Sequence, residues 1–145
     1  MFLIGGCGWL PADPPATTPA PPHADAPLLH DWKIAGHVLG TRALISDYDA
    51  AEFDGRTVSV TDGGYASPWS GRCEQSTRQK APRAVAEVAL EHDVAVAQAD
   101  RLALGTPVVE YQLRCATGSA PGMIVYVGGA HAVTCFAGVC YLLVR

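Results

Sequence analysis

The C-terminal stretch MIVYVGGAHAVTCFAGVCYLLVR, residues 123–145, decides the fold class of this chain. Two glycine-containing turns, at Gly128-Gly129 and around Gly138, divide it into three runs of apolar and β-branched residues. Short runs of this composition, separated by tight turns, predict consecutive antiparallel strands. The chain is therefore expected to end in a three-stranded β-meander.

Patterns upstream of the meander predict further strands and two short helices. Ser46 begins a capping-box pattern in which Asp49 stands where glutamate is usual, and Gly55 provides the helix stop. Residues 84–92 place apolar side chains at helical spacing among strong helix formers. Strands are expected at 28–39, 56–61, 65–73 and 106–115, helices at 46–55 and 84–92, and a polar surface loop at 74–82.

This order of elements predicts an α+β fold, with a mostly antiparallel curved sheet or small β-barrel and two short helices. Residues 28–145 are expected to form a single disulfide-stabilised, β-rich domain. Barrels of this size either fill their interior with side chains or hold one small ligand.

Composition narrows the class of partner. The chain has 145 residues, of which 49% are hydrophobic and 17% charged, so it is long and apolar enough for one domain with its own core. Ten basic and 14 acidic residues give a net charge of −4, which argues against a nucleic-acid partner. The sequence contains no run of 18 or more apolar residues of the kind that predicts a transmembrane helix.

The first part of the sequence differs in composition from the rest. Residues 11–27 hold seven of the 11 prolines and no lysine or arginine. A segment of this kind buries too little apolar surface to offset its ordering entropy, so it predicts an extended tether in a polyproline II conformation.

The sequence IGGC at residues 4–7 resembles a bacterial lipobox, the site at which a cysteine is lipidated and becomes N-terminal. The resemblance implies that residues 1–6 are a signal-peptide remnant, that Cys7 carries the lipid, and that residues 7–27 are the lipidated cysteine and its proline-rich tether. In such lipoproteins an aspartate directly after the lipidated cysteine resembles a signal for retention in the inner membrane. This chain has Gly8 at that position, so the resemblance implies anchoring in the outer membrane with the domain facing the periplasm. The alternative is a cytosolic domain without an anchor.

The remaining four cysteines predict two disulfides, because an even number favours pairing in an oxidising compartment. Cys135 and Cys140 flank a four-residue connection between two strand-like runs, which places them opposite each other at disulfide distance. This pairing leaves Cys73 to bond to Cys115. The alternative is four reduced thiols, and a zinc site is not expected because Cys-x₄-Cys is not a zinc-ribbon spacing.

Catalytic motifs are weak in this sequence. His92-Asp93 could belong to a hydrolytic triad, but the sequence has no Gly-x-Ser-x-Gly elbow to present a nucleophile. His131 precedes Cys135 by four residues without the signature of the cysteine transpeptidases. The serines that could supply a triad hydroxyl are Ser67, Ser70 and Ser76. Because these motifs are weak, we expect no catalytic residue, no metal and no cofactor.

Tyr65, Trp69 and Arg72 form the candidate binding surface, since aromatic residues and arginine are enriched in recognition hot spots. In a regular strand Tyr65 and Trp69 would share one face. The competing interpretation is that Trp69 caps the core beside the disulfide of Cys73.

Residues 111–118, YQLRCATG, resemble the opening strands of small membrane-bound inhibitors of c-type lysozyme, which are lipidated periplasmic β-barrels. The overall plan resembles short uncharacterised lipoproteins of proteobacteria. The sequence thus predicts a lipid-anchored envelope lipoprotein whose periplasmic domain binds an envelope protein or a small ligand and is not an enzyme. The alternatives are an inhibitor of c-type lysozyme-like wall hydrolases and a small cell-envelope hydrolase.

Overall fold

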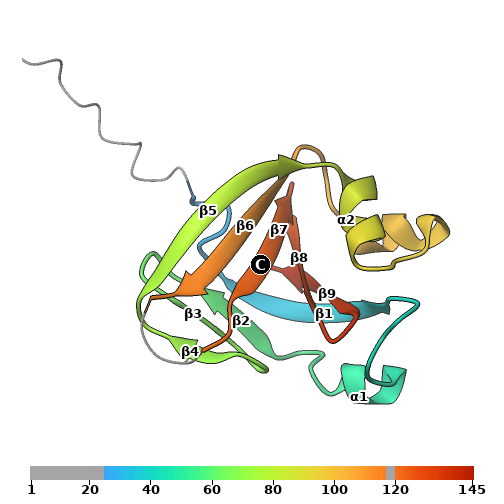
Figure 1. The fold of residues 1–145 in the computed structure, drawn as a ribbon, viewed down its shortest axis with the longest axis horizontal. Coiled ribbons are helices and arrows are strands. Elements are labelled where there is room, and N and C mark those ends of the chain that lie inside the picture. Colours follow the sequence, from blue (N-terminus) through green and yellow to red (C-terminus); the bar gives the residue numbers. More distant parts are fainter. Residues whose placement is uncertain (1–24, 117–119) are drawn as a thin grey trace, which may run out of the picture.

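The computed structural model describes residues 25–116 and 120–145, so Cys7 and most of the predicted tether lie outside the described residues. The chain curls a nine-stranded antiparallel sheet into a nearly closed barrel, with three short helices toward the right-hand end in Figure 1. Its elements are β1 (Asp31–Leu39), α1 (Asp47–Ala51), β2 (Thr57–Val60), β3 (Tyr65–Ser67), β4 (Gly71–Cys73), β5 (Ser76–Arg83), α2 (Val85–Glu91), the 3-10 helix η1 (Val96–Leu102), β6 (Val108–Cys115), β7 (Met123–Gly128), β8 (His131–Phe136) and β9 (Val139–Val144).

The sheet has the order β4-β3-β2-β1-β9-β8-β7-β6-β5. The C-terminal meander predicted from the sequence is confirmed, because β7, β8 and β9 pair in succession. Strand β9 then pairs along its whole length with β1 and so joins the two ends of the chain. The first and last strands of the domain therefore lie in the middle of the sheet, and β4 and β5 form its edges.

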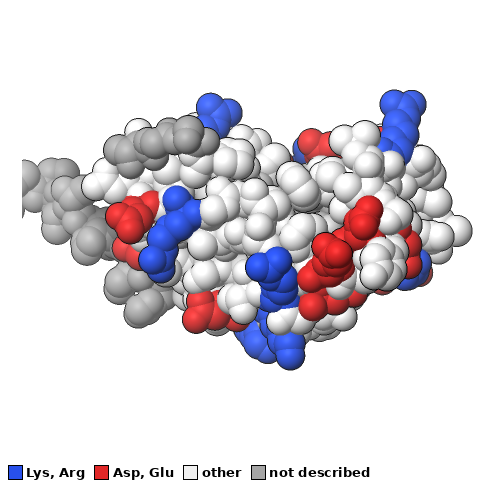
Figure 2. All heavy atoms as spheres, turned by 90° about the horizontal axis from the view of Figure 1, so that it is seen from below, with Lys and Arg blue, Asp and Glu red and all other residues white. Residues whose placement is uncertain are grey.

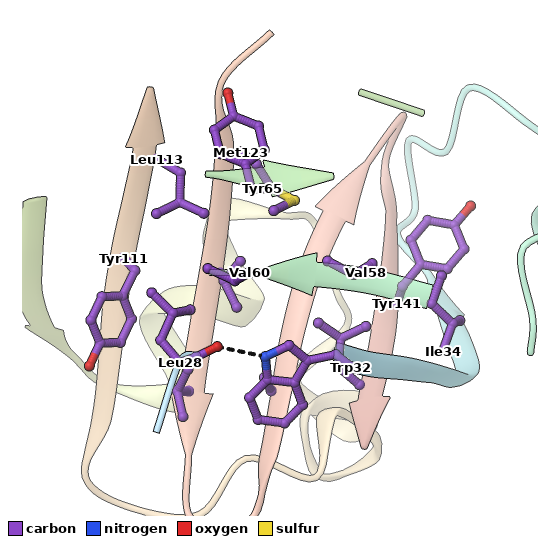
Figure 3. Packing of buried hydrophobic residues seen from close by; sticks show 14 of the residues in the cluster. Leu28, Trp32, Ile34, Val58, Val60, Tyr65, Tyr111, Leu113, Met123 and Tyr141 are labelled. Atoms are coloured by element: carbon purple, nitrogen blue, oxygen red, sulfur yellow. Dashed lines mark hydrogen bonds between the residues drawn. The ribbon is translucent and has the colours of Figure 1, made fainter. Parts of the chain in front are cut away.

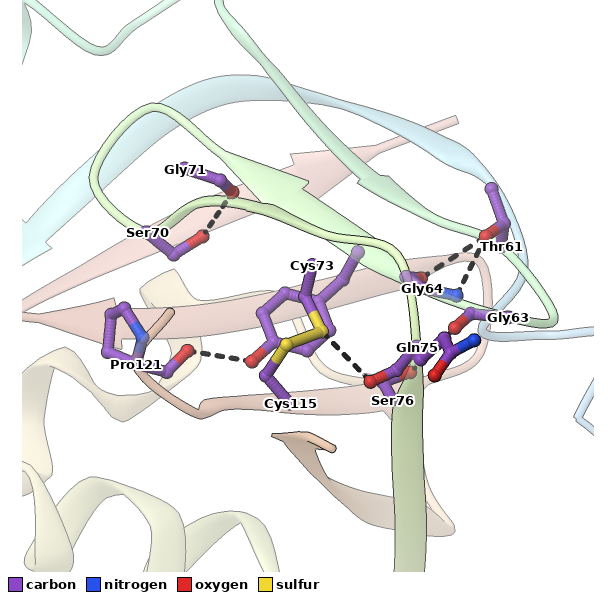
Figure 4. The surroundings of a disulfide bond; sticks show 11 residues. Thr61, Gly63, Gly64, Ser70, Gly71, Cys73, Gln75, Ser76, Cys115 and Pro121 are labelled. Carbon is purple, nitrogen blue, oxygen red and sulfur yellow. Dashed lines mark hydrogen bonds between the residues drawn. A yellow bond between two sulfur atoms is a disulfide. The ribbon is translucent and has the colours of Figure 1, made fainter. Parts of the chain in front are cut away.

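The β3–β4 hairpin and the turn between β2 and β3 approach strands β5 and β6 along a seam that closes most of the barrel (Figure 4). A disulfide joins Cys73 of β4 to Cys115 of β6, in the pairing that the sequence predicts. Beside it, the backbone N–H of Ser76 donates to the carbonyl oxygen of Gly63 at 2.9 Å. The guanidinium of Arg78 donates to the carbonyl oxygen of Asp62 at 3.1 Å. One covalent bond and several hydrogen bonds thus hold the seam that no continuous strand pairing spans.

Side chains fill the interior of the barrel (Figure 3). Trp32, Ile34 and Leu143 are buried at the centre. The indole N–H of Trp32 donates to the carbonyl oxygen of Leu28 at 2.9 Å, so the one polar atom of this large side chain is satisfied. Of the two possibilities for a barrel of this size, an interior filled with side chains or one that holds a small ligand, this barrel shows the first.

A second core lies on the outer face of the meander, beneath α2 and η1. In β7, Val125 and Val127 belong to the interior core, whereas Tyr126 between them belongs to the outer one. This strand is buried on both faces, which explains why its sequence is an unbroken apolar run with no alternation. Val88 and Leu102 provide the helical side of this outer core.

Three local predictions were wrong. The segment 74–82, predicted as a surface loop, contains most of β5, an edge strand whose side chains mostly face solvent and therefore show no apolar alternation. The single strand predicted at 65–73 is the hairpin of β3 and β4, with Gly71 at φ +69°. The described ranges contain three short helices where the sequence predicts two, because η1 has no strong apolar period.

The predicted first helix is present as α1, and Ser46 accepts a hydrogen bond from the backbone N–H of Asp49 at 3.1 Å. Its predicted end at Gly55 was wrong, because the helix ends at Ala51 with Glu52 as the C-cap. In the described part of the chain, every helix is too short or too polar to cross a membrane. On the face shown in Figure 2, lysine and arginine side chains lie among aspartate and glutamate and do not gather into one basic patch.

Candidate functional site

A groove of about 200 Å³ lies beside the β8–β9 hairpin, and we call it the hairpin groove. Its lining comes from the segment that enters β7, from the start of β7, from the β3–β4 turn and from the β8–β9 hairpin. The end of α2 contributes the polar part of the lining. The lining residues are Trp69, His92, Pro121, Gly122, Met123, Ile124, Cys135 and Phe136.

Stacked aromatic rings form the apolar wall of the hairpin groove. The ring of Trp69 lies parallel to that of Phe136, with centroids 5.4 Å apart and planes 8° apart. On its other side Trp69 stacks on Tyr141 at 4.8 Å. Burial, with a smaller contribution from Asp54, raises the pKa of Tyr141 to about 12, so this ring stays neutral. Phe136 remains 40% exposed and presents an apolar face to solvent.

The turn of the hairpin fixes where Cys135 and Phe136 lie. Ala137 and Gly138 have φ values of 54° and 78°, as a two-residue turn of the primed type requires. Cys135 is paired directly with Cys140, and their sulfurs form the disulfide that the sequence predicts. The loop has two residues where the sequence predicts four, because Phe136 and Val139 extend the strand pairing.

A polar network borders the groove behind His92. The Nε2 atom of His92 lies 2.8 Å from the hydroxyl of Tyr126, and that hydroxyl donates to Glu91 Oε2 at 3.4 Å. Glu91 is also ion-paired with Arg83, whose Nε lies 3.8 Å from the buried carboxylate of Glu110. Because the Tyr126 hydroxyl donates to a carboxylate, it accepts a hydrogen bond from His92 Nε2, which leaves Nδ1 as the unprotonated nitrogen.

Burial sets the protonation state of this network. Desolvation lowers the pKa of His92 and outweighs the nearby acidic groups, so the imidazole is neutral near pH 7. Desolvation also raises the pKa of Tyr126, so its hydroxyl keeps its proton. One ring nitrogen of His92 and the sulfurs of Cys135 and Cys140 lie within 4.8 Å of one another. Both sulfurs are bonded to each other, so in this state they offer no thiolate to a metal ion.

The predicted binding surface is divided between two hollows. Tyr65 is buried and donates from its hydroxyl to the carbonyl oxygen of Pro121 at 2.7 Å. Trp69 lines the hairpin groove and also caps the core, so both interpretations of this residue describe part of its position. Arg72 is exposed and lines a second hollow of about 330 Å³ over β2–β4, and Tyr65 contributes to the lining of the same hollow. Trp69 therefore lines a different hollow from Tyr65 and Arg72, because it lies in the turn between β3 and β4.

The residues weighed for catalysis have other partners in the structure. Ser67 and Ser70 hydrogen-bond to each other at 2.6 Å within the β3–β4 turn. His131 Nδ1 donates to the carbonyl oxygen of Ala103 at 3.0 Å. The histidine beside Cys135 is instead His92, which the sequence offers as a possible triad member with Asp93 and not as a neighbour of Cys135.

Comparisons with protein-family models, with curated proteins and with solved structures find no match for this chain.

Proposed function

We propose that this chain is a lipid-anchored lipoprotein of the cell envelope whose barrel domain binds an envelope protein through the hairpin groove. The observation that carries the binding part is the contrast between the filled interior of the barrel and the open hairpin groove. Side chains such as Trp32 and Leu143 fill the barrel interior, so a partner must bind outside. The hairpin groove is an outer surface where a tryptophan and a half-exposed phenylalanine lie together.

An apolar side chain of the partner suits this groove better than a charged one. Trp69, Met123, Ile124 and Phe136 present carbon surface, and His92 is neutral at pH 7. Aromatic residues at the centre of an interface contribute most of its binding energy when water is excluded around them. Removal of one such anchor commonly costs about 2 kcal/mol or more of binding free energy.

The anchoring part of the proposal has a different basis. The lipobox resemblance at Cys7 and the proline-rich tether support it, and the two disulfides are compatible with an oxidising compartment. Its test is the intact mass of the protein isolated from its bacterial host, with and without reductant. The proposal expects a lipid adduct on a chain that begins at Cys7, and two hydrogens gained per disulfide on reduction. An unmodified N-terminus would remove the anchor from the proposal.

Binding is tested by site-specific photocrosslinking in the intact envelope. A photoreactive phenylalanine replaces Phe136, and the control carries it at Val96, an apolar residue that is 90% exposed on η1. We expect a discrete crosslinked protein from position 136 that disappears when Trp69 is replaced by alanine. Equal crosslinking from both positions would reject the groove as the binding site. Purified domain added to c-type lysozyme tests the inhibitor alternative, which requires loss of lysozyme activity.

A further inference from the structure

We propose that the Cys135–Cys140 disulfide is reactive, exchanging with the thiols of a cysteine-containing polypeptide in the hairpin groove, with His92 as the base. This inference rests on the proposed function for the groove as the place where a polypeptide binds. It adds a chemical class of ligand, a reduced cysteine pair with apolar neighbours. It does not depend on the lipid anchor.

Access to the two sulfurs is unequal. Cys135 lines the hairpin groove and is partly exposed, whereas Cys140 is completely buried in the outer core. A thiol that enters the groove can therefore reach the sulfur of Cys135 and not that of Cys140. This asymmetry defines Cys135 as the attacked atom and Cys140 as the leaving group.

The protein does not need this disulfide to hold the two cysteines together. The two-residue turn and the pairing of Cys135 with Cys140 fix the register of the hairpin. On its other side β9 is paired along its whole length with β1. Opening the S–S bond therefore leaves both sulfurs in place, so the bond can open and re-form without unfolding of the domain. The Cys73–Cys115 bond differs, because it crosses a seam between two sheet edges.

His92 is placed to move the proton that exchange requires. One of its ring nitrogens lies within 4.8 Å of both sulfurs, and Tyr126 holds its Nε2 at 2.8 Å. Burial lowers its pKa, so the neutral ring can accept a proton near pH 7. The charged and titratable groups that face it are Arg83 from β5, Glu91 and Asp93 from the end of α2, Glu110 from β6 and Tyr126 from β7.

The step balances without a further reagent. The incoming thiol gives its proton to His92, and its sulfur attacks the sulfur of Cys135. A bond forms between these two sulfurs, the Cys135–Cys140 bond breaks, and its electron pair leaves on Cys140, which takes the proton from His92. A second thiol of the same polypeptide then displaces Cys135, with its own proton passing to that sulfur. The polypeptide dithiol is oxidised to a disulfide, and the protein disulfide is reduced to two thiols.

The experiment measures exchange of the oxidised full chain with reduced glutathione, followed by acid quenching, alkylation and mapping by mass spectrometry. We expect the Cys135–Cys140 pair to open at least about tenfold faster than Cys73–Cys115, with glutathione found on Cys135. Equal rates for the two pairs, or glutathione on Cys140, would overturn the inference. Loss of the Phe136 crosslink with fast exchange retained would instead count against the proposed function alone.

The role of His92 has its own control. His92→Gln is expected to slow exchange about tenfold near pH 7 and to have little effect above about pH 9, where the attacking thiol is already ionised. His131→Gln, on the same hairpin but bonded to Ala103, is expected to have no effect at either pH. If His92→Gln does not fold, Tyr126→Phe takes its place as the test. It keeps the aromatic ring and removes the hydroxyl that orients His92, so a smaller slowing of exchange is expected. A pH-independent effect of both variants would show that His92 acts only through structure.

Discussion

The two disulfides should contribute very different amounts to the stability of this domain. Cys73 and Cys115 are 42 positions apart in sequence and bridge the seam of the barrel, whereas Cys135 and Cys140 are 5 positions apart within one hairpin. The perturbation is replacement of each pair by two alanines. Alanine fits both sites, because all four cysteines lie on strands with apolar neighbours.

The magnitude follows from the length of chain that each bond closes. In the chain-entropy model, closing the longer loop stabilises the folded state by about 4 kcal/mol, and closing the hairpin by about 2 kcal/mol. For a domain of this size, the unfolding entropy is such that each 1 kcal/mol of lost stability lowers Tm by about 4 °C. Loss of the seam disulfide should therefore lower Tm by about 15 °C, and loss of the hairpin disulfide by about 8 °C.

The assay is thermal unfolding, which gives Tm, together with urea unfolding of the wild type and both double variants without reductant, each followed by tryptophan fluorescence and by far-UV circular dichroism. The difference between the variants is the test, because it cancels effects common to any loss of a disulfide. If the hairpin variant were the less stable of the two, the assignment of the seam disulfide as the main covalent support of the barrel would be refuted. An m-value that falls only in the seam variant would show that the barrel edges separate before the rest unfolds.

Three further perturbations test particular contacts. The hydrogen bonds of His37 to two aspartates outweigh its burial and raise its pKa above 6.5, so its contribution is complete below that pH and is lost as the pH rises through the folded-state pKa. Unfolding free energies should show that His37→Gln costs more at about pH 5.5 than at about pH 8.5, and by less than about 1 kcal/mol because one aspartate is largely exposed. Gly129→Ala should cost about 1 kcal/mol, because Gly129 has a positive φ, and Gly138→Ala should cost well over that amount. Gly138 also has a positive φ, and only there would an added Cβ come within 2.7 Å of another backbone segment. Equal losses in urea unfolding would contradict this prediction. Trp32→Phe should cost about 2 kcal/mol in the same assay, because the carbonyl oxygen of Leu28 loses one of its two donors and the core loses volume.

The parts of the fold that could be predicted are those where local signals and burial agree. The meander has one turn at Gly129 and another at Gly138, both with positive φ, between apolar runs. The disulfides followed from the hairpin, since one pairing determines the other. Strand β5 could not be predicted in this way, because it is an exposed edge strand without an apolar face. Its conformation depends on its pairing with β6.

The candidate site was only partly predictable for a related reason. Trp69 was indicated by its residue type, but its partners Phe136 and Tyr141 are far along the chain and meet it only because β9 pairs with β1. His92 ends a helix, and nothing in its neighbourhood in sequence points to Cys135. The packing of α2 on Tyr126 of β7 brings them together. Contacts of this range depend on the tertiary fold, which local patterns do not specify.

The distribution of burial over the sheet restricts where this domain can meet a partner. Interior side chains fill the barrel, and α2 and η1 cover the outer face of the meander. The hollow over β2–β4 is lined by glycine, polar and charged residues together with Tyr65, Ala66 and Cys73, and the Tyr65 and Cys73 side chains are almost completely buried, so it exposes little apolar surface. The hairpin groove instead combines apolar rings, a neutral histidine and a disulfide sulfur in one place. A partner that binds by burying apolar side chains therefore gains most at the hairpin groove, and it brings its own groups within reach of Cys135 when it does so.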